Sequence, residues 1–245
     1  MHVSVILAAL ALGSGSAPDT TGESVVRRMH DRYAGRWPSN VTFVQKSTFY
    51  EGDSTRVETW YEAIEPGKLR IDVAPIENGN GLIFRNDSLY QFKADSMALA
   101  IPLVHPLMVL SRDVYDLPVE RTLARLEGLG IDVSKVREDT WQGRPVYVVG
   151  AEAGDLKSPQ FWVDRERLVF VRLLEPSQQD PSKTEETQFN EYQELGEGWI
   201  ETEVVFLLDG ERRMLEEYSE IREGVQFPRG LFDPAAWGPP AWVEG

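Results

Sequence analysis

Carboxylates are the side chains of this sequence that are numerous enough to suggest chemistry. Glutamates gather within residues 58–62, 185–194 and 216–220, but no nucleophile, paired histidine or glycine loop accompanies them. His30 and His105 are far apart and the chain has no cysteine, so a zinc site is not expected. An oxygen-only calcium site is left open, although no EF-hand-like spacing is present. We therefore expect no catalytic residues, no metal and no cofactor.

Charge and composition exclude other classes of function. The chain has 245 residues, of which 42% are hydrophobic, and 25 basic residues against 40 acidic ones give a net charge of −15. A nucleic-acid-binding protein needs a basic footprint, and anionic headgroups would be repelled, so we expect neither partner. Most charged residues are expected on solvated faces. The length fits one mainly β domain over residues 18–245.

The N-terminus reads as a targeting segment. An apolar run over residues 3–12 is followed by small residues at 13–17, which is typical of a secretory signal peptide. We expect it to occupy residues 1–17, with cleavage after Gly13 or Ala17; a short core helix is the alternative. The run is too short to span a bilayer. Without cysteine, the exported protein would have no disulfide and no thiol for lipid attachment.

A dense series of short strands over residues 40–93 is the main structural signal. Apolar Leu69 and Ile71 alternate with Arg70 and Asp72, which predicts an antiparallel sheet with one buried face and one charged, solvated face. Turn residues separate the strands. Strands resume at residue 131. Residues 211–223 fit a helix by propensity, but 215–221 repeat the pattern of 189–195, which favours a strand.

Helices are expected at three places around these strands. Thr20 and Glu23 fit a capping box before a helix whose apolar stripe includes Tyr33 and Trp37. Asp116 could cap a further helix that ends at Gly128 or Gly130. The apolar residues 97–110 are open to two interpretations, a buried strand plus a helical turn or a movable lid over a cavity.

Several weak motifs follow one another in a recognisable order. They are the N-terminal helix followed by residues 41–46, then 60–70, 86–90, 106–110, 162–164 and 232–234. In this order, the chain resembles the LolA/LolB family of periplasmic lipoprotein carriers and the broader group of outer-membrane lipoprotein-sorting proteins. The resemblance covers nearly all of the mature chain. It implies a mainly β (α+β) fold, an incomplete antiparallel β-barrel, in which helices cover a concave face that holds acyl chains. From the strand pattern we expect about ten or eleven strands, an N-terminal helix and two short helices.

The resemblance and the apolar pattern together give candidate site residues. Those expected to line an acyl-chain cavity, with plain core packing as the alternative for each, are Trp60, Leu69, Ile71, Phe84, Tyr90, Phe92, Leu99, Phe161, Val171 and Phe206. The resemblance places Tyr33, Trp37, Leu107, Met108 and Leu110 in the lid. Carriers of the family have an arginine immediately before the proline that matches Pro66, where this chain has Glu65; Glu65 and Arg70 are therefore the candidate polar gate.

Three functions follow from these observations. The favoured one is a diffusible, monomeric periplasmic carrier for the acyl chains of lipoproteins or lipids, with an inner-membrane release complex and an outer-membrane acceptor as implied partners. The absence of a lipobox cysteine favours a LolA-like carrier over an anchored LolB-like acceptor. The second is an RseB-like envelope-stress sensor on the same scaffold, because a fold alone does not fix a function. The least favoured is an enzyme that uses surface carboxylates.

Overall fold

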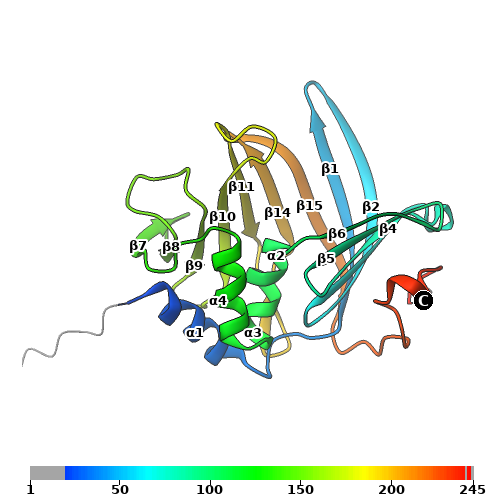
Figure 1. The fold of residues 1–245 in the computed structure, drawn as a ribbon, viewed down its shortest axis with the longest axis horizontal. Helices are drawn as coiled ribbons and strands as arrows, with labels where there is room; N and C mark the ends of the chain where they lie inside the picture. Colours follow the sequence, from blue (N-terminus) through cyan, green and yellow to red (C-terminus); the bar gives the residue numbers. More distant parts are fainter. Residues whose placement is uncertain (1–19, 241, 244–245) are drawn as a thin grey trace, which may run out of the picture.

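The computed structural model describes residues 20–240, 242 and 243, and most of them lie in or between antiparallel strands (Figure 1). The expected signal peptide, residues 1–17, falls outside the described residues. Within the described part, no helix is long and apolar enough to cross a membrane.

The described part of the chain contains fifteen strands. They are β1 (Val41–Glu51), β2 (Ser54–Glu65), β3 (Lys68–Val73), β4 (Gly81–Arg85), β5 (Ser88–Lys93), β6 (Ser96–Pro102), β7 (Val136–Trp141), β8 (Arg144–Val149), β9 (Gln160–Asp164), β10 (Phe170–Pro176), β11 (Thr184–Asn190), β12 (Gln193–Leu195), β13 (Gly198–Ile200), β14 (Glu203–Leu208) and β15 (Glu211–Arg222). The expectation of a strand at 211–223 is confirmed by β15.

Thirteen of these strands form one open antiparallel sheet. Its order is β6-β5-β4-β3-β2-β1-β15-β14-β11-β10-β9-β8-β7, while β12 and β13 form a separate pair. Two meanders are thus joined where β1 pairs with β15. Because β6 and β7 remain at the edges, the sheet is an incomplete barrel, as expected. The strand count exceeds the expected ten or eleven partly because Ala94 and Asp95, both at positive φ, make a tight β5–β6 turn without a glycine.

The N-terminal helix α1 (Gly22–Tyr33) begins one residue later than the sequence suggests. Thr21, not Thr20, is the N-cap: its hydroxyl accepts from the N–H of Ser24 at 3.1 Å, and the Ser24 hydroxyl accepts from the N–H of Thr21 at 3.0 Å. Serine therefore takes the place expected for Glu23. Glu23 instead forms an ion pair with Arg27 at 2.9 Å on the exposed side of the helix.

The remaining helices lie between β6 and β7. A continuous helical segment consists of α2 (Pro106–Met108), the π-helical stretch η2 (Val109–Asp113) and α3 (Val114–Asp116), and α4 (Val119–Gly128) follows it. Two single 3-10 turns are η1 (Ile76–Asn78) and η3 (Pro234–Ala236). The expectation that Asp116 caps α4 is wrong, since Asp116 ends α3 and Pro118 precedes α4 without a side-chain cap.

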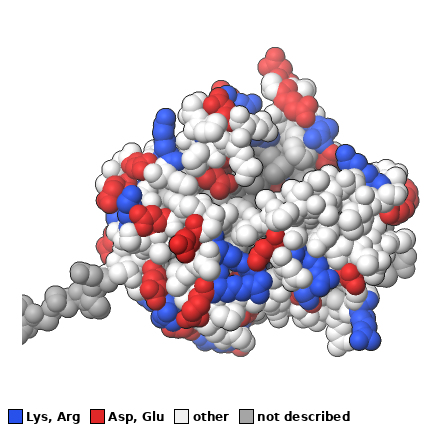
Figure 2. All heavy atoms as spheres, viewed as in Figure 1, with Lys and Arg blue, Asp and Glu red and all other residues white. Residues whose placement is uncertain are grey.

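The helices cover one face of the curved sheet (Figure 1). Apolar residues of α1, α3 and α4 pack with β8–β10 in the largest core, which includes Met29, Tyr115, Leu126 and Phe161. The apolar stretch 97–110 is divided between two environments. Its first part is the exposed edge strand β6, in a region of Figure 2 with few charges, and its second part is helical.

The C-terminal segment covers the opposite face of the sheet. Trp237 stacks on Phe92 of β5 with ring centroids 4.2 Å apart, and Phe232 is buried. Beneath this segment, Arg70 and Asp72 are buried and paired at 2.8 Å, and Arg70 Nη2 also donates to the carbonyl of Gly238 at 2.6 Å. The expectation of a solvated charged face is therefore wrong at these two residues, because a segment that contacts Arg70 from 161 and 168 residues further along the chain lies over them.

Candidate functional site

A cavity of about 320 Å³ lies between the concave face of the sheet and the helix α2, and Figure 2 shows the hollow on this side of the molecule. Its walls come from β1–β4, β10, β11, β14 and β15. The apolar lining consists of Phe43, Trp60, Ile64, Leu69, Ile71, Leu82, Phe84, Pro106, Leu107, Met108, Leu173, Phe189, Phe206 and Met214. The volume lies at the lower end of the range for small-molecule sites, which are mostly apolar with a few polar groups.

Strand register explains why one wall is apolar. Leu69 of β3 lies opposite Ile64 of β2 and Phe84 of β4, and Ile71 lies opposite Leu82. Residues directly opposite each other in an antiparallel pair share a face. The inward positions of three adjacent strands are therefore occupied by branched and aromatic side chains, which pack with Met108 of the helix above them.

The helical segment over the cavity, residues 106–116 with its N-cap His105, forms the cover of the cavity. Polar contacts hold this cover at one end. Asp113 Oδ1 accepts from the N–H of Gly67, in the β2–β3 turn, at 2.9 Å. Its other oxygen pairs with Arg125 of α4 at 2.5 Å, and Arg125 also pairs with Asp87 of the β4–β5 turn at 2.5 Å. Since Asp113 belongs to η2, these contacts fasten the cover to two turns of the wall.

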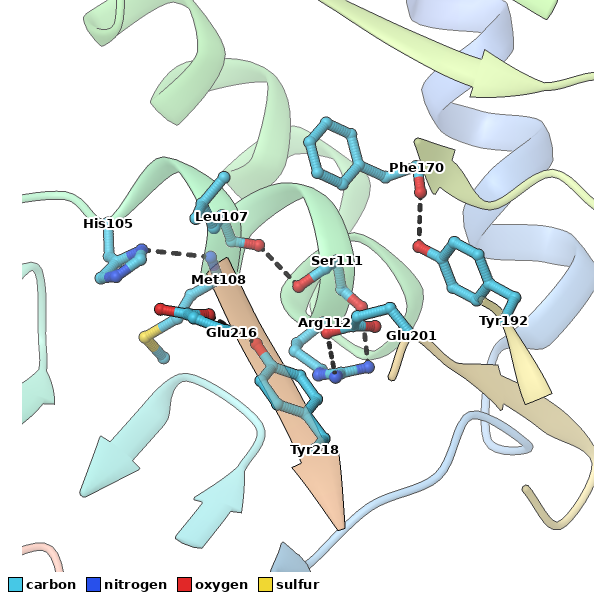
Figure 3. Close-up of polar contacts among 10 residues, drawn as sticks. All are labelled: His105, Leu107, Met108, Ser111, Arg112, Phe170, Tyr192, Glu201, Glu216 and Tyr218. Carbon is cyan, nitrogen blue, oxygen red and sulfur yellow. Dashed lines mark hydrogen bonds and ion pairs between the residues drawn. The ribbon is translucent and has the colours of Figure 1, made fainter. Parts of the chain in front are cut away.

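A group of polar side chains lies inside the cavity (Figure 3). Arg112 projects inward from η2 and forms an ion pair with Glu201, with 2.6 Å between Nη2 and Oε1. Glu216 of β15 accepts from the hydroxyl of Tyr218 at 2.9 Å. Glu62 of β2 also lines the cavity, and all three glutamates are buried. A π-helical turn often marks a functional position, and here it carries Arg112 into the cavity.

Burial sets the protonation of this group. It raises the pKa of Glu62 well above its usual value, with Glu216 as the next cause, and it raises the pKa of Glu216 to about 7. Burial also raises the pKa of Glu201, although Arg112 opposes that shift. At the cover, burial lowers the pKa of His105 to about 4. Near neutral pH the imidazole is therefore uncharged, while Glu216 is close to the middle of its titration.

Seven of the predicted site residues line this cavity. Five were predicted for its wall and two for its lid, and they are Trp60, Leu69, Ile71, Phe84, Phe206, Leu107 and Met108. The apolar pattern of the strands pointed to the five wall residues, and the resemblance to the LolA/LolB family pointed to Leu107 and Met108.

Other predicted lining residues lie elsewhere. Phe92 is on the opposite face under Trp237, Tyr90 is half-buried outside the cavity, and Leu99 is 40% exposed on the edge strand. Phe161 is fully buried in the main core, and Val171 lines a separate pocket of about 60 Å³. Phe161 packs with residues of the helices, so it is a core residue, which was the alternative interpretation.

The remaining predicted lid and gate residues also lie outside the cavity. Tyr33 and Trp37 pack against Tyr115, with the rings of Trp37 and Tyr115 stacked at 3.7 Å, and Leu110 is fully buried in the same core. Arg70 is beneath the C-terminal segment, as described above. Glu65 pairs with Lys68 within the β2–β3 turn. The backbone of Gly67, not the side chain of Glu65, makes this turn's hydrogen bond to the cover.

The sequence reasoning missed the buried glutamates and Arg112. It treated Glu62 and Glu216 as parts of charged surface runs. A signal was present, because Glu62 is two residues from both Trp60 and Ile64, and Glu216 is two residues from Met214 and Tyr218. No comparable pattern identifies Glu201 or Arg112. Among the residues that the structure describes, no group of three or more acidic or histidine side chains is arranged to hold a metal ion.

Comparisons with known proteins bear on the fold. No protein-family model and no curated protein matches the chain. A solved domain from Vibrio parahaemolyticus, called a putative outer membrane lipoprotein-sorting protein, is similar with a TM-score of 0.58 and 11% identity, over 87% of this chain and 97% of that chain. A LolA superfamily protein from Nitrosomonas europaea gives 0.54 and 11% over the same shares. A DUF1329 family protein from Desulfovibrio piger gives 0.58 and 14%, over 89% and 98%. The chain therefore has the LolA-like fold.

Proposed function

We propose that this protein is a water-soluble periplasmic carrier that binds acyl chains of lipoproteins or lipids in the cavity and conveys them toward the outer membrane. The observation that supports this most directly is the apolar wall of Leu69, Ile71 and Phe84 beneath the cover residues Leu107 and Met108. The similarity in fold to a lipoprotein-sorting domain points the same way.

Affinity for an acyl chain comes from sheltering its methylene groups from water. Each methylene exposed to water costs about 0.8 kcal/mol, so a carrier gains affinity in proportion to the chain length that it covers. Binding and release then require no covalent step, and we propose that the protein acts without catalysis. The contacts of Asp113 with Gly67 and Arg125 would have to open for a chain to enter from the side of the cover.

The first test uses protein purified from the periplasm. Protein exported to the periplasm should copurify with lipid or lipoprotein detectable by mass spectrometry, and the delipidated protein should bind a fluorescent acyl probe. Filling the cavity with Met214→Trp should weaken probe binding at least tenfold. Val57→Trp, at a position that is 55% exposed on β2, is the matched control and should leave binding unchanged.

The results that would overturn the proposal are concrete. They are a protein without bound lipid that also fails to bind the probe, or equal effects of the two tryptophan variants. Circular dichroism and urea denaturation would show that each variant is folded. If the exported protein instead captures a regulatory membrane protein and no lipid, the sensor hypothesis replaces the carrier.

A further inference from the structure

The cavity has an acidic lining that an acyl chain alone would not need. Five carboxylates line it, namely Glu62, Glu175, Glu185, Glu201 and Glu216. Among the residues that the structure describes, Arg112 is the one arginine or lysine in the lining, and His105, whose pKa is about 4, adds no charge near neutral pH. The lining therefore has an excess of acidic groups on a wall that is otherwise apolar.

The single arginine is already engaged. Arg112 Nη2 is 2.6 Å from Glu201 Oε1, and both side chains are buried. The second oxygen of Glu201 is buried and accepts no hydrogen bond from any residue that the structure describes. Within residues 20–240, 242 and 243, the side chain of Glu62 makes no hydrogen bond or ion pair, although the charge of Arg112 acts on it, and it is 6% exposed. Glu216 has the neutral hydroxyl of Tyr218 as a donor. Several buried carboxylate oxygens thus face the cavity, and the charge of Arg112, which is paired with Glu201, is shared among them.

Buried carboxylates are energetically costly unless a ligand supplies donors or a positive charge for them. A buried carboxylate without a partner loses hydration that nothing replaces, and a leucine at the same inward position would cost nothing of this kind. Aromatic faces lie beside the carboxylates, since Tyr218 stacks on Phe43 at 4.3 Å and Trp60 lines the same space. Carboxylates next to aromatic faces are the combination that recognises ammonium groups.

We propose that the natural ligand is an amphiphile with a protonated amine, whose ammonium group is bound by Glu62 and Glu216 while its hydrocarbon lies along Leu69, Ile71 and Phe84. This inference rests on the proposed acyl-binding function and specifies the class of ligand. The free oxygen of Glu201 completes the acceptor set. Glu175 and Glu185, which lie opposite each other on β10 and β11, extend the negative potential along the wall.

Protonation of Glu62 and Glu216 should make amine binding depend on pH. The groups that face the ammonium position are Glu62 from β2, Glu201 from the loop between β13 and β14, Glu216 and Tyr218 from β15, and Arg112 from η2. His105 of the cover also lines the cavity, but with a pKa of about 4 it stays uncharged over this range of pH. An ammonium group favours the ionised form of Glu62 and Glu216, so binding displaces protons from them. Affinity for an amine should therefore fall as pH decreases from 7.5 to 5.5, whereas affinity for an uncharged amphiphile should not.

The experiment compares three ligands of equal chain length. Dodecylamine, dodecanol and dodecanoate, each below its micelle-forming concentration, would compete with a fluorescent acyl probe on the delipidated full-length protein. We expect dodecylamine to bind at least tenfold more tightly than dodecanol, and dodecanoate to bind most weakly. The double variant Glu62→Gln/Glu216→Gln should lose this preference. Glu217→Gln, on the exposed side of β15 beside Lys46, should keep it.

The possible results distinguish the amine preference from the proposed acyl-binding function. Equal binding of all three ligands would support an acyl carrier and overturn the amine preference. Binding of none of them would overturn both. If the double variant is folded and still prefers dodecylamine, the assignment of Glu62 and Glu216 is wrong. Since the ligand series on the unmodified protein already tests the preference, a variant that fails to fold does not prevent a decision.

Discussion

The two halves of the concave face differ in what fills them. Over β8–β10, side chains of α1, α3 and α4 pack closely against the sheet, and Phe161, Val163 and Tyr115 are at most 1% exposed. Over β1–β4, β14 and β15 the cover supplies Leu107 and Met108, and a cavity with buried glutamates remains. One continuous sheet thus supports a dense core at one end and a hollow at the other. The difference depends on how many helices lie above each half (Figure 1).

This contrast separates stability from binding. A core without space for water derives its stability from close packing, which is sensitive to the loss of even a few methylenes. A hollow lined with unpaired acceptors contributes less to stability and is available for a ligand. We therefore expect substitutions in the two halves to act on different measured quantities.

The largest expected effect comes from emptying the core. Phe161→Ala should reduce the free energy of unfolding by about 3–5 kcal/mol, because the enclosed side chain leaves a cavity that cannot collapse fully. Phe206→Ala, on the half-buried wall of the hollow, should cost about 1–2 kcal/mol and mainly weaken binding of the acyl probe. Urea denaturation would measure both. Equal losses of stability would contradict the distinction between the halves.

The next effect is a pH dependence that originates in the hollow. The pKa of Glu216 is raised from 4.5 to about 7, so the folded chain binds a proton more tightly than the unfolded chain does. The free energy of unfolding should therefore fall as pH rises from about 4.5 to about 7, by on the order of 3 kcal/mol for this group. Raised pKa values of Glu62 and, to about 6, of Asp116 act in the same direction.

Replacing the carboxyl would identify its share of that slope. Glu216→Gln should flatten the decline measured by urea denaturation between pH 5 and pH 7.5, and Glu217→Gln should not. The lowered pKa of Asp155, about 2, affects stability only at more acidic pH. A slope that is unchanged in Glu216→Gln would place the titrating group elsewhere.

The smallest effect is expected on the face of the sheet that the C-terminal segment covers. Because this face lies outside both the dense core and the hollow, a substitution there is a control for both. Trp237→Ala removes the stacking on Phe92 and the contact of the Arg70 guanidinium with the indole ring at 4.2 Å. Because Trp237 is only half-buried, we expect a loss of about 1–2 kcal/mol of stability. Binding of the acyl probe should not change. A loss of binding would show that the C-terminal segment is coupled to the cavity.

Part of the fold follows from local patterns. Alternation along residues 68–73 predicted the apolar face of β3 in the wall, and the apolar stripe of residues 26–37 predicted α1. The turn at Ala94 and Asp95 was missed because alanine is not a typical residue at positive φ and no glycine marks the turn. The start of α1 was misplaced by one residue because Thr20 and Thr21 are adjacent and only the folded backbone chooses between them.

What the sequence determined by itself was the type of sheet, the inward apolar positions of β2–β4 and the region of the cover, since period-two alternation and helical spacing are local properties. Only the tertiary structure decided that Phe161 is core, that Phe92 and Arg70 lie under the C-terminal segment, and that Glu62 and Glu216 are buried beside Arg112. The physical reason is that burial depends on which distant segment lies over a face, and a strand's own pattern does not contain that information.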